Sequence, residues 1–227
     1  MATVVDLIAT MLKREGVQYL FGIPGGGGSI DLLDATEREG IRFILNSHET
    51  AAAIMACVVA ELTGIPGVVL TAIAPGVTNV ANGVAYAYLE RAPLLVLSDN
   101  YPWSAIQVVL RQTLNHRQIF QGITKWTASL SAEWAHETLQ RALRTTLEDR
   151  PGPVQLDLPD DVAQYRRRIR RRTEGGIAFQ HTHRHRGSDR SQPVSRAVRH
   201  DSRAIGSAGA AKRSGKKTGL ESLPFSE

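Results

Sequence analysis

Ser47-His48-Glu49-Thr50-Ala51-Ala52-Ala53 joins a predicted strand to a predicted helix and places one acidic residue between them. The strand is expected over 41–47, and the Ala-rich run 51–62 is apolar enough for a mostly buried helix. Ionised carboxylates are seldom buried without a partner, so Glu49 at this junction needs a physical reason. One reason is structural, because acidic side chains stabilise helix N-termini. The other is functional, and the residues around the junction decide between them.

Apolar runs on both sides of this junction repeat the same order of strand and helix. This alternation is typical of right-handed βαβ units. We therefore expect an α/β fold with a doubly wound, mostly parallel sheet of about six strands and helices on both faces. The predicted strands are 17–22, 41–45, 67–71, 94–98, 125–130 and 154–158, and the predicted helices are 4–12, 30–38, 49–63, 77–89 and 132–148.

Ligands of such sheets bind beyond the carboxyl ends of the strands. The loops 22–29, 47–49, 72–79 and 98–102 should lie together on this edge. The first of them contains Gly25-Gly26-Gly27-Gly28, which allows backbone to approach a flat ligand but lacks the Lys-Ser/Thr of a P-loop. A flexible turn explains these glycines equally well, so the loop alone does not indicate a site.

Charge divides the 227 residues into two parts. Residues 1–165 hold 11 Lys and Arg against 17 Asp and Glu, whereas residues 166–227 hold 16 against 5. The second part begins with Arg166-Arg167-Arg168 and shows no apolar periodicity, which predicts disorder. We expect a domain over 1–163 and a disordered Arg-rich tail over 164–227. The tail has few aromatic residues, so nucleic acid is an unlikely partner and any binding would be nonspecific.

Cys57 is the single cysteine of the chain and lies inside the apolar helix, as a small buried residue of a reducing compartment would. No apolar run approaches the ~20 residues that span a bilayer. The sequence therefore predicts a cytoplasmic protein without a membrane partner. His, Cys, Asp and Glu show no metal-ligand spacing, so we expect no metal site, and His116 in its polar segment is expected to be solvated.

An ordered set of short motifs gives Glu49 a functional explanation. The set resembles the N-terminal, pyrimidine-binding domain of thiamine-diphosphate-dependent enzymes of the acetolactate synthase and 2-oxo-acid decarboxylase group, over about residues 2–163. The motifs are Phe21-Gly22-Ile23-Pro24-Gly25-Gly26, His48-Glu49-Thr50-Ala51-Ala52-Ala53, Ala74-Pro75-Gly76-Val77-Thr78-Asn79, Ala92-Pro93-Leu94-Leu95-Val96-Leu97, Thr124-Lys125-Trp126 and Arg150-Pro151-Gly152-Pro153-Val154.

The resemblance implies a role for particular residues. Glu49 would be catalytic, because the matching glutamate hydrogen-bonds the ring nitrogen of the cofactor's aminopyrimidine. That contact helps to remove the proton from the thiazolium carbon, which then attacks a 2-oxo acid substrate. The residues expected to bind the cofactor are Ile23, Pro24 and Gly25 at one border of the pyrimidine pocket, Pro75 and Asn79 opposite, Glu49 itself, and Gln112 near the reacting carbon or the substrate.

The resemblance also implies that one half of the cofactor site lies elsewhere. In this family a second domain holds the diphosphate through Mg²⁺ with a Gly-Asp-Gly motif, which does not occur in these 227 residues. We expect the chain to bind only the pyrimidine half of thiamine diphosphate, and Mg²⁺ to come with a missing domain or a partner.

Three explanations of this half-site remain open. The favoured one is a truncated gene product that is inactive alone, with its tail read out of frame. The second is the small subunit of a split enzyme, such as the alpha subunit of a 2-oxo-acid decarboxylase, paired with a diphosphate-binding chain. The third is nonspecific nucleic-acid binding through the tail. The expected partners are a second copy in a dimer or larger homo-oligomer, or a diphosphate-binding partner subunit.

Overall fold

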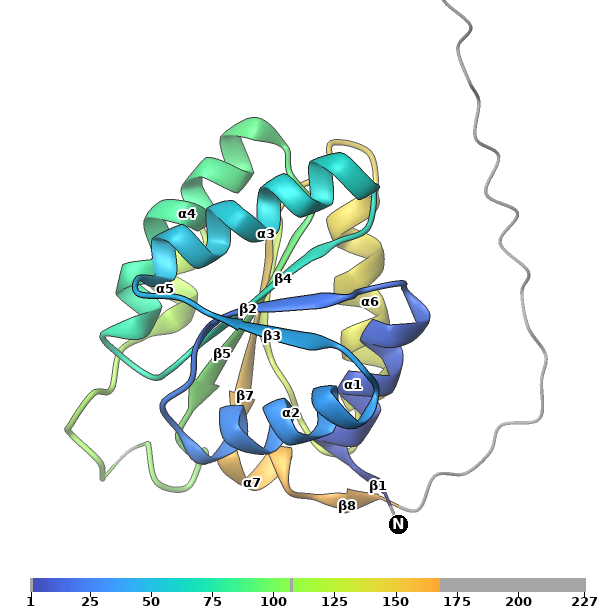
Figure 1. The fold of residues 1–227 in the computed structure, drawn as a ribbon. Coiled ribbons are helices and arrows are strands. Elements are labelled where there is room, and N and C mark those ends of the chain that lie inside the picture. The colour runs from blue at the N-terminus through green and yellow to red at the C-terminus, as the bar shows by residue number, and fades with distance from the viewer. Residues whose placement is uncertain (1, 107, 168–227) are drawn as a thin grey trace, which may run out of the picture. The chain divides into compact units, whose positions relative to one another are not determined.

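A computed structural model describes residues 2–106 and 108–167, and its centre is a parallel sheet (Figure 1). The order of the six strands is β3-β2-β4-β5-β7-β6, and each pairing is parallel. The expected α/β class, strand number and strand direction are therefore confirmed. The strands are β2 (Tyr19–Ile23), β3 (Arg42–Leu45), β4 (Gly67–Thr71), β5 (Leu94–Asn100), β6 (Trp126–Ser129) and β7 (Val154–Pro159).

Helices cover both faces of the sheet, as expected. One face carries α1 (Val4–Arg14), α2 (Gly27–Arg38), α6 (Ala135–Leu147) and α7 (Asp160–Ala163); the other carries α3 (Glu49–Thr63), α4 (Gly76–Glu90) and α5 (His116–Phe120). The short helices α5 and α7 were not predicted, because four or five residues are too few to show a helical period.

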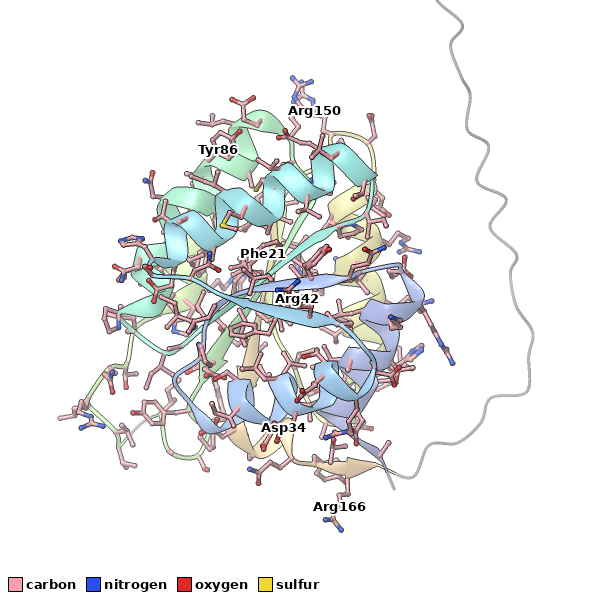
Figure 2. The ribbon with its side chains drawn as sticks, viewed as in Figure 1. Phe21, Asp34, Arg42, Tyr86, Arg150 and Arg166 are labelled. Carbon is pink, nitrogen blue, oxygen red and sulfur yellow. The ribbon has the colours of Figure 1, made fainter. Side chains whose placement is uncertain are left out.

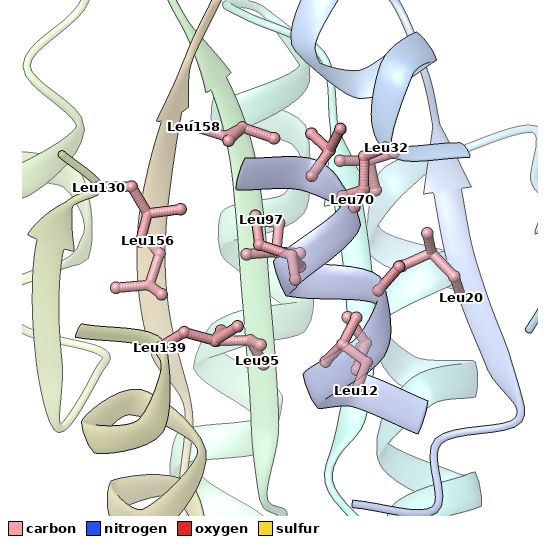
Figure 3. Packing of buried hydrophobic residues seen from close by; sticks show 14 of the residues in the cluster. Leu12, Leu20, Leu32, Leu70, Leu95, Leu97, Leu130, Leu139, Leu156 and Leu158 are labelled. Carbon is pink, nitrogen blue, oxygen red and sulfur yellow. The ribbon is translucent and has the colours of Figure 1, made fainter. Parts of the chain in front are cut away.

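Two apolar cores lie between the sheet and its helices. Figure 3 shows leucines of β2, β4, β5 and β7 packed against leucines of α1, α2 and α6. The opposite core contains Phe21, seen in the interior in Figure 2, together with the alanines and valines of α3 and α4. All residues of β4 are buried, as in strands covered on both faces. Cys57 belongs to this second core, and its burial raises the pKa of the thiol to about 12.

Local signals fix the ends of the helices. Thr3 caps α1 because its hydroxyl accepts from the Asp6 amide while the Asp6 carboxylate accepts from the Thr3 amide. Gly64 ends α3 in the left-handed conformation, with φ of 72°. None of the helices within residues 2–106 and 108–167 is both long and apolar enough to cross a membrane.

The last described residues return to the N-terminus. β1 (Ala2–Thr3) pairs antiparallel with β8 (Arg166–Arg167), and the Val4 amide donates to the carbonyl of Tyr165. Residues 164–167 of the predicted tail are thus described. The rest of the tail lies outside the described residues, so its disorder and the domain boundary at 163 stay predictions.

The strand order reverses between β2 and β4. From β2 the chain passes through α2 to β3 on one side, and then through α3 to β4 on the other side of β2. Open α/β sheets bind their ligands at the carboxyl edge beside such a switch point. The loops after β2, β3 and β4 meet there.

Candidate functional site

Glu49 lies at this switch point as the first residue of α3. It is 7% exposed, which is rare for a carboxylate, and it occupies the first turn of the helix. His48 caps the same helix, because its Nδ1 accepts from the Thr50 amide at 3.2 Å. The short strand β3 thus delivers Glu49 directly to the carboxyl edge of the sheet.

The start of α4 provides the contacts of the Glu49 carboxylate. Asn79 Nδ2 donates to Glu49 Oε2 at 3.2 Å, and a Cβ on Gly76 would lie 3.2 Å from Glu49 Oε1. The Thr50 hydroxyl donates to the carbonyl of Asn79 at 2.6 Å, which holds the two helix starts together. One carboxylate oxygen therefore has a side-chain donor, and the other lies against glycine backbone.

The loop after β2 reaches the loop after β4. Ile23 ends β2 and its carbonyl accepts from the Ala72 amide, while a Cβ on Gly25 would lie 2.6 Å from the Cβ of Ala72. Pro24 and Gly25 continue this loop, and Pro75 is the N-cap residue of α4. The fold therefore places Ile23, Pro24, Gly25, Pro75 and Asn79 on the same edge as Glu49.

Gln112 lies apart from this group. It is an exposed residue in the loop between β5 and α5, with φ of 58°. Within the described part of the chain, no hydrogen bond joins it to Glu49 or Asn79. Its predicted place beside the reacting carbon stays a prediction.

This arrangement suits one edge of a flat nitrogen heterocycle. An enclosed carboxyl group at a helix start can share a proton with a ring nitrogen, and glycine backbone beside it would allow a planar group to approach closely. Residues 2–106 and 108–167 contain no group of three or more His, Cys, Asp or Glu that could hold a metal ion. The residues present fit the pyrimidine half of the expected cofactor.

Comparison with protein families agrees with this geometry. Residues 2–125 match the family described as thiamine pyrophosphate enzyme, N-terminal TPP binding domain. The chain belongs to this family.

Relatives of this thiamine pyrophosphate (TPP) domain include large enzymes. It is 35% identical over 158 residues to a probable acetolactate synthase large subunit of Methanocaldococcus jannaschii, which covers 69% of this chain and 27% of that protein. It is 36% identical over 159 residues to the acetolactate synthase isozyme 3 large subunit of Escherichia coli, covering 69% and 28%. A probable 2-ketoarginine decarboxylase of Pseudomonas aeruginosa is also 36% identical over 159 residues, covering 68% and 28%. The chain spans little more than a quarter of these relatives.

The TPP domain contains a second buried acid that the sequence did not single out. Asp99 is 0% exposed, and neither of its oxygens has a hydrogen-bond partner within the described residues. Burial raises the pKa of this carboxyl to about 6, and the charge of Asp160 adds to the rise. Ser29 and Gly26 lie near enough to lower this pKa in part, although neither makes a hydrogen bond of good geometry to Asp99. A Cβ on Gly26 would lie 2.6 Å from Asp99 Oδ2, so the glycine loop packs directly on this acid.

His116 is the clearest difference from the sequence-based expectation. It is 3% exposed rather than solvated, and its Nδ1 lies 2.6 Å from Asp157 Oδ1. Gln155 Nε2 donates to the same oxygen at 2.7 Å. The polar neighbours Arg117 and Gln118 suggested a solvated segment, but α5 turns His116 inward onto β7. The polar residues alternating with leucines in the run 154–158 were a signal of such a partner.

The motif Thr124-Lys125-Trp126 makes structural contacts with α6. Lys125 Nζ donates to the carbonyls of Thr145 and Glu148 at the C-terminal end of α6. The guanidinium of Arg141 lies 4.3 Å from the centre of the Trp126 ring. A lysine at the last carbonyls of a helix stabilises its C-terminus, so this motif fastens α6 to β6.

Proposed function

We propose that this chain forms the pyrimidine side of a thiamine diphosphate site in an enzyme that decarboxylates or carboligates 2-oxo acids. The observation that carries the proposal is the enclosed Glu49 carboxylate at the switch point, held by Asn79. Family membership supports the cofactor, and the acetolactate synthase and decarboxylase relatives support the reaction class. These relatives have different functions, so the proposal names the class of 2-oxo acids and no single substrate.

Glu49 would hold the hydrogen bond to the ring nitrogen of the aminopyrimidine. Asn79 orients the carboxylate through Oε2, and Thr50 fixes Asn79 through its backbone carbonyl. Bound thiamine diphosphate supplies the nucleophilic carbon and the electron sink for decarboxylation. The low exposure of Glu49 keeps water from competing for this hydrogen bond. Ile23, Pro24, Gly25 and Pro75 would border the ring, and Gln112 would face the substrate.

The diphosphate and Mg²⁺ would be held by residues outside these 227. That assignment follows from the missing Gly-Asp-Gly motif and from the lack of a metal-ligand cluster in the described residues. A diphosphate-binding partner subunit would then complete the site. In either case the chain would be inactive alone, whether it is a truncated product or one part of a split enzyme.

The proposal is tested by binding of the pyrimidine half alone. We expect 4-amino-2,5-dimethylpyrimidine to shift the backbone amide resonances of Gly25, Gly76 and Asn79 in NMR spectra of the chain. In Glu49→Gln the acceptor for the ring contact is changed, and we expect these shifts to weaken at least several-fold. Glu61→Gln removes an exposed carboxylate from the same helix and should leave them unchanged.

Two outcomes would contradict the proposal. One is the absence of specific shifts at saturating pyrimidine in the folded chain. The other is equal binding by the Glu49→Gln and Glu61→Gln variants, which would reduce Glu49 to a helix-capping residue.

A further inference from the structure

A cavity of about 520 Å³ lies beside β6 and β7 and the end of β5, and Glu49 is not among its lining residues. α3 and α4 pack against β2, β4 and β5 on this sheet face, whereas α5 and the residues just before it line the cavity. The volume is within the range of ligand pockets in proteins. None of its lining residues belongs to the predicted pyrimidine site.

The floor of the cavity is polar where a sheet interior is normally apolar. Gln155 pairs in register with Thr127, and Asp157 pairs with Ser129, so two neighbouring strands present polar side chains on one face. The opposite face of β7 carries Leu156 and Leu158 in the leucine core. Gln155 is buried, and Ser129, on the edge strand β6, is exposed at the rim.

The hydrogen bonds at the floor leave two acceptors of lining residues without a partner among the described residues. A carboxylate only accepts, so His116 Nδ1 must carry the proton that it shares with Asp157 Oδ1. Gln155 donates to the same oxygen. No hydrogen bond in the described chain uses Asp157 Oδ2 or His116 Nε2. The cavity floor thus offers a carboxylate oxygen and an imidazole nitrogen, both already oriented by their other contacts.

A purely structural role would be to hold α5 on the sheet. Burying a carboxylate, an imidazole and an amide for that purpose costs desolvation that apolar side chains would avoid. Phe120, at the other end of α5, already anchors the helix in the apolar core. The polar group is therefore better explained by what enters the cavity.

We propose that this cavity binds a small cation, a guanidinium or ammonium group on a short apolar chain. The charged group would donate to Asp157 Oδ2 and the neighbouring acceptors, and the chain would lie against Ile106, Leu114 and the Trp103 ring. Arg117, the cation among the lining residues, is exposed and belongs to the rim. Binding at this cavity does not require thiamine diphosphate, so its test is independent of the test of the proposed function.

The test compares three ligands of nearly equal shape by calorimetry and by NMR of the His116 ring. Butylguanidinium is the cation, butylurea its neutral counterpart, and pentanoate an anion. We expect butylguanidinium to bind at one site, to shift the His116 ring resonances, and to bind at least ~10-fold more tightly than the other two.

Three variants identify the contact. Asp157→Asn keeps the shape but removes the charge, and should weaken butylguanidinium about tenfold. Trp103→Ala alters an exposed side chain without disturbing the core and should weaken it several-fold. Asp161→Asn, an exposed acid on α7, should bind as the unmodified chain does. Equal binding of butylguanidinium and butylurea, no binding at millimolar concentration to the folded chain, or unchanged binding in both Asp157→Asn and Trp103→Ala would overturn the proposal.

Discussion

A buried carboxylate either finds donors or keeps its proton, and this domain contains both kinds. Glu49 has the amide of Asn79 and the start of α3 beside it. Asp99 has no hydrogen-bond partner for either oxygen among the described residues, and its pKa is raised to about 6. The first arrangement is suited to holding a ligand, whereas the second lowers the stability of the folded chain when the proton leaves.

Asp99 should therefore make stability depend on pH. Its pKa rises from an ordinary 3.8 to about 6 on folding, so the folded state holds this proton more tightly than the unfolded chain. The contribution of Asp99 to the free energy of unfolding is then greatest below about pH 4 and is lost as the pH rises through about 6. The Asp99→Asn variant has no carboxyl group to ionise at this position, so its free energy of unfolding does not fall in this way. Relative to the unmodified chain, we expect the variant to gain up to about 3 kcal/mol between pH 4 and pH 7.

Chemical denaturation at a series of pH values measures this difference. Asp160, whose charge acts on Asp99, is present in both proteins, so the comparison uses only the difference in stability between them. Asp161→Asn, on the same short helix as Asp160, serves as the control and should show no such trend. A stability difference that stays constant with pH would show that Asp99 does not hold its proton.

The sequence identified Glu49 but not Asp99, for a physical reason. Glu49 stands beside an apolar helix in its own local sequence, so its enclosure could be inferred from neighbours along the chain. The enclosure of Asp99 depends on Gly26, which is distant in sequence and reaches it only after folding. β5 also extends to Asn100 rather than ending at 98 as predicted, which places Asp99 inside the strand.

At the scale of elements, the crossing of α3 and α4 positions the site. Gly83 in α4 allows this crossing to be close, because a Cβ there would lie 2.6 Å from the Cβ of Ala53 and 2.9 Å from the carbonyl oxygen of Thr50. Thr50 is the neighbour of Glu49 and binds Asn79. A change that moves the two helices apart should therefore lengthen or break the hydrogen bond between Asn79 and Glu49.

Gly83→Ala tests this packing. In an open helix the change would stabilise the chain by ~1 kcal/mol through helix propensity. Here we expect a net loss of about 1–2 kcal/mol, because the added methyl group meets the backbone of α3. The exposed change Asn82→Ala on the same helix should be neutral or slightly stabilising. Urea denaturation gives both values, and a stabilised Gly83→Ala variant would disprove the close contact.

Elements differed in how well the sequence predicted them. β4 is buried on both faces, so its continuous apolar run was recognisable. α3 was recognisable from its Ala-rich apolar run, and α6 was long enough for a helix to be predicted. α5 has five residues and is held by Phe120 and His116 on the sheet, which are tertiary contacts without a local signature. The cavity beside α5 was consequently missed as well.

The described part of the chain supplies only one side of the proposed cofactor site. The described residues provide an edge for a heterocycle and no cluster for a metal ion. We therefore expect the 227-residue chain, supplied with thiamine diphosphate and Mg²⁺, to release no CO₂ from 2-oxo acids above background. Release that is abolished by Glu49→Gln would contradict this expectation. Adding the part of the E. coli relative that this chain does not match tests whether the other half can be supplied separately.

The pairing of β1 with β8 brings Ala2 beside Arg167. The first and last described residues are thus neighbours, so a short linker could join them without crossing the sheet. New ends could then be opened at Gly122, an exposed turn residue whose added side chain would meet no neighbour. A circularly permuted form cut there should keep the parallel sheet intact, and the domain could equally be inserted as a loop within another protein.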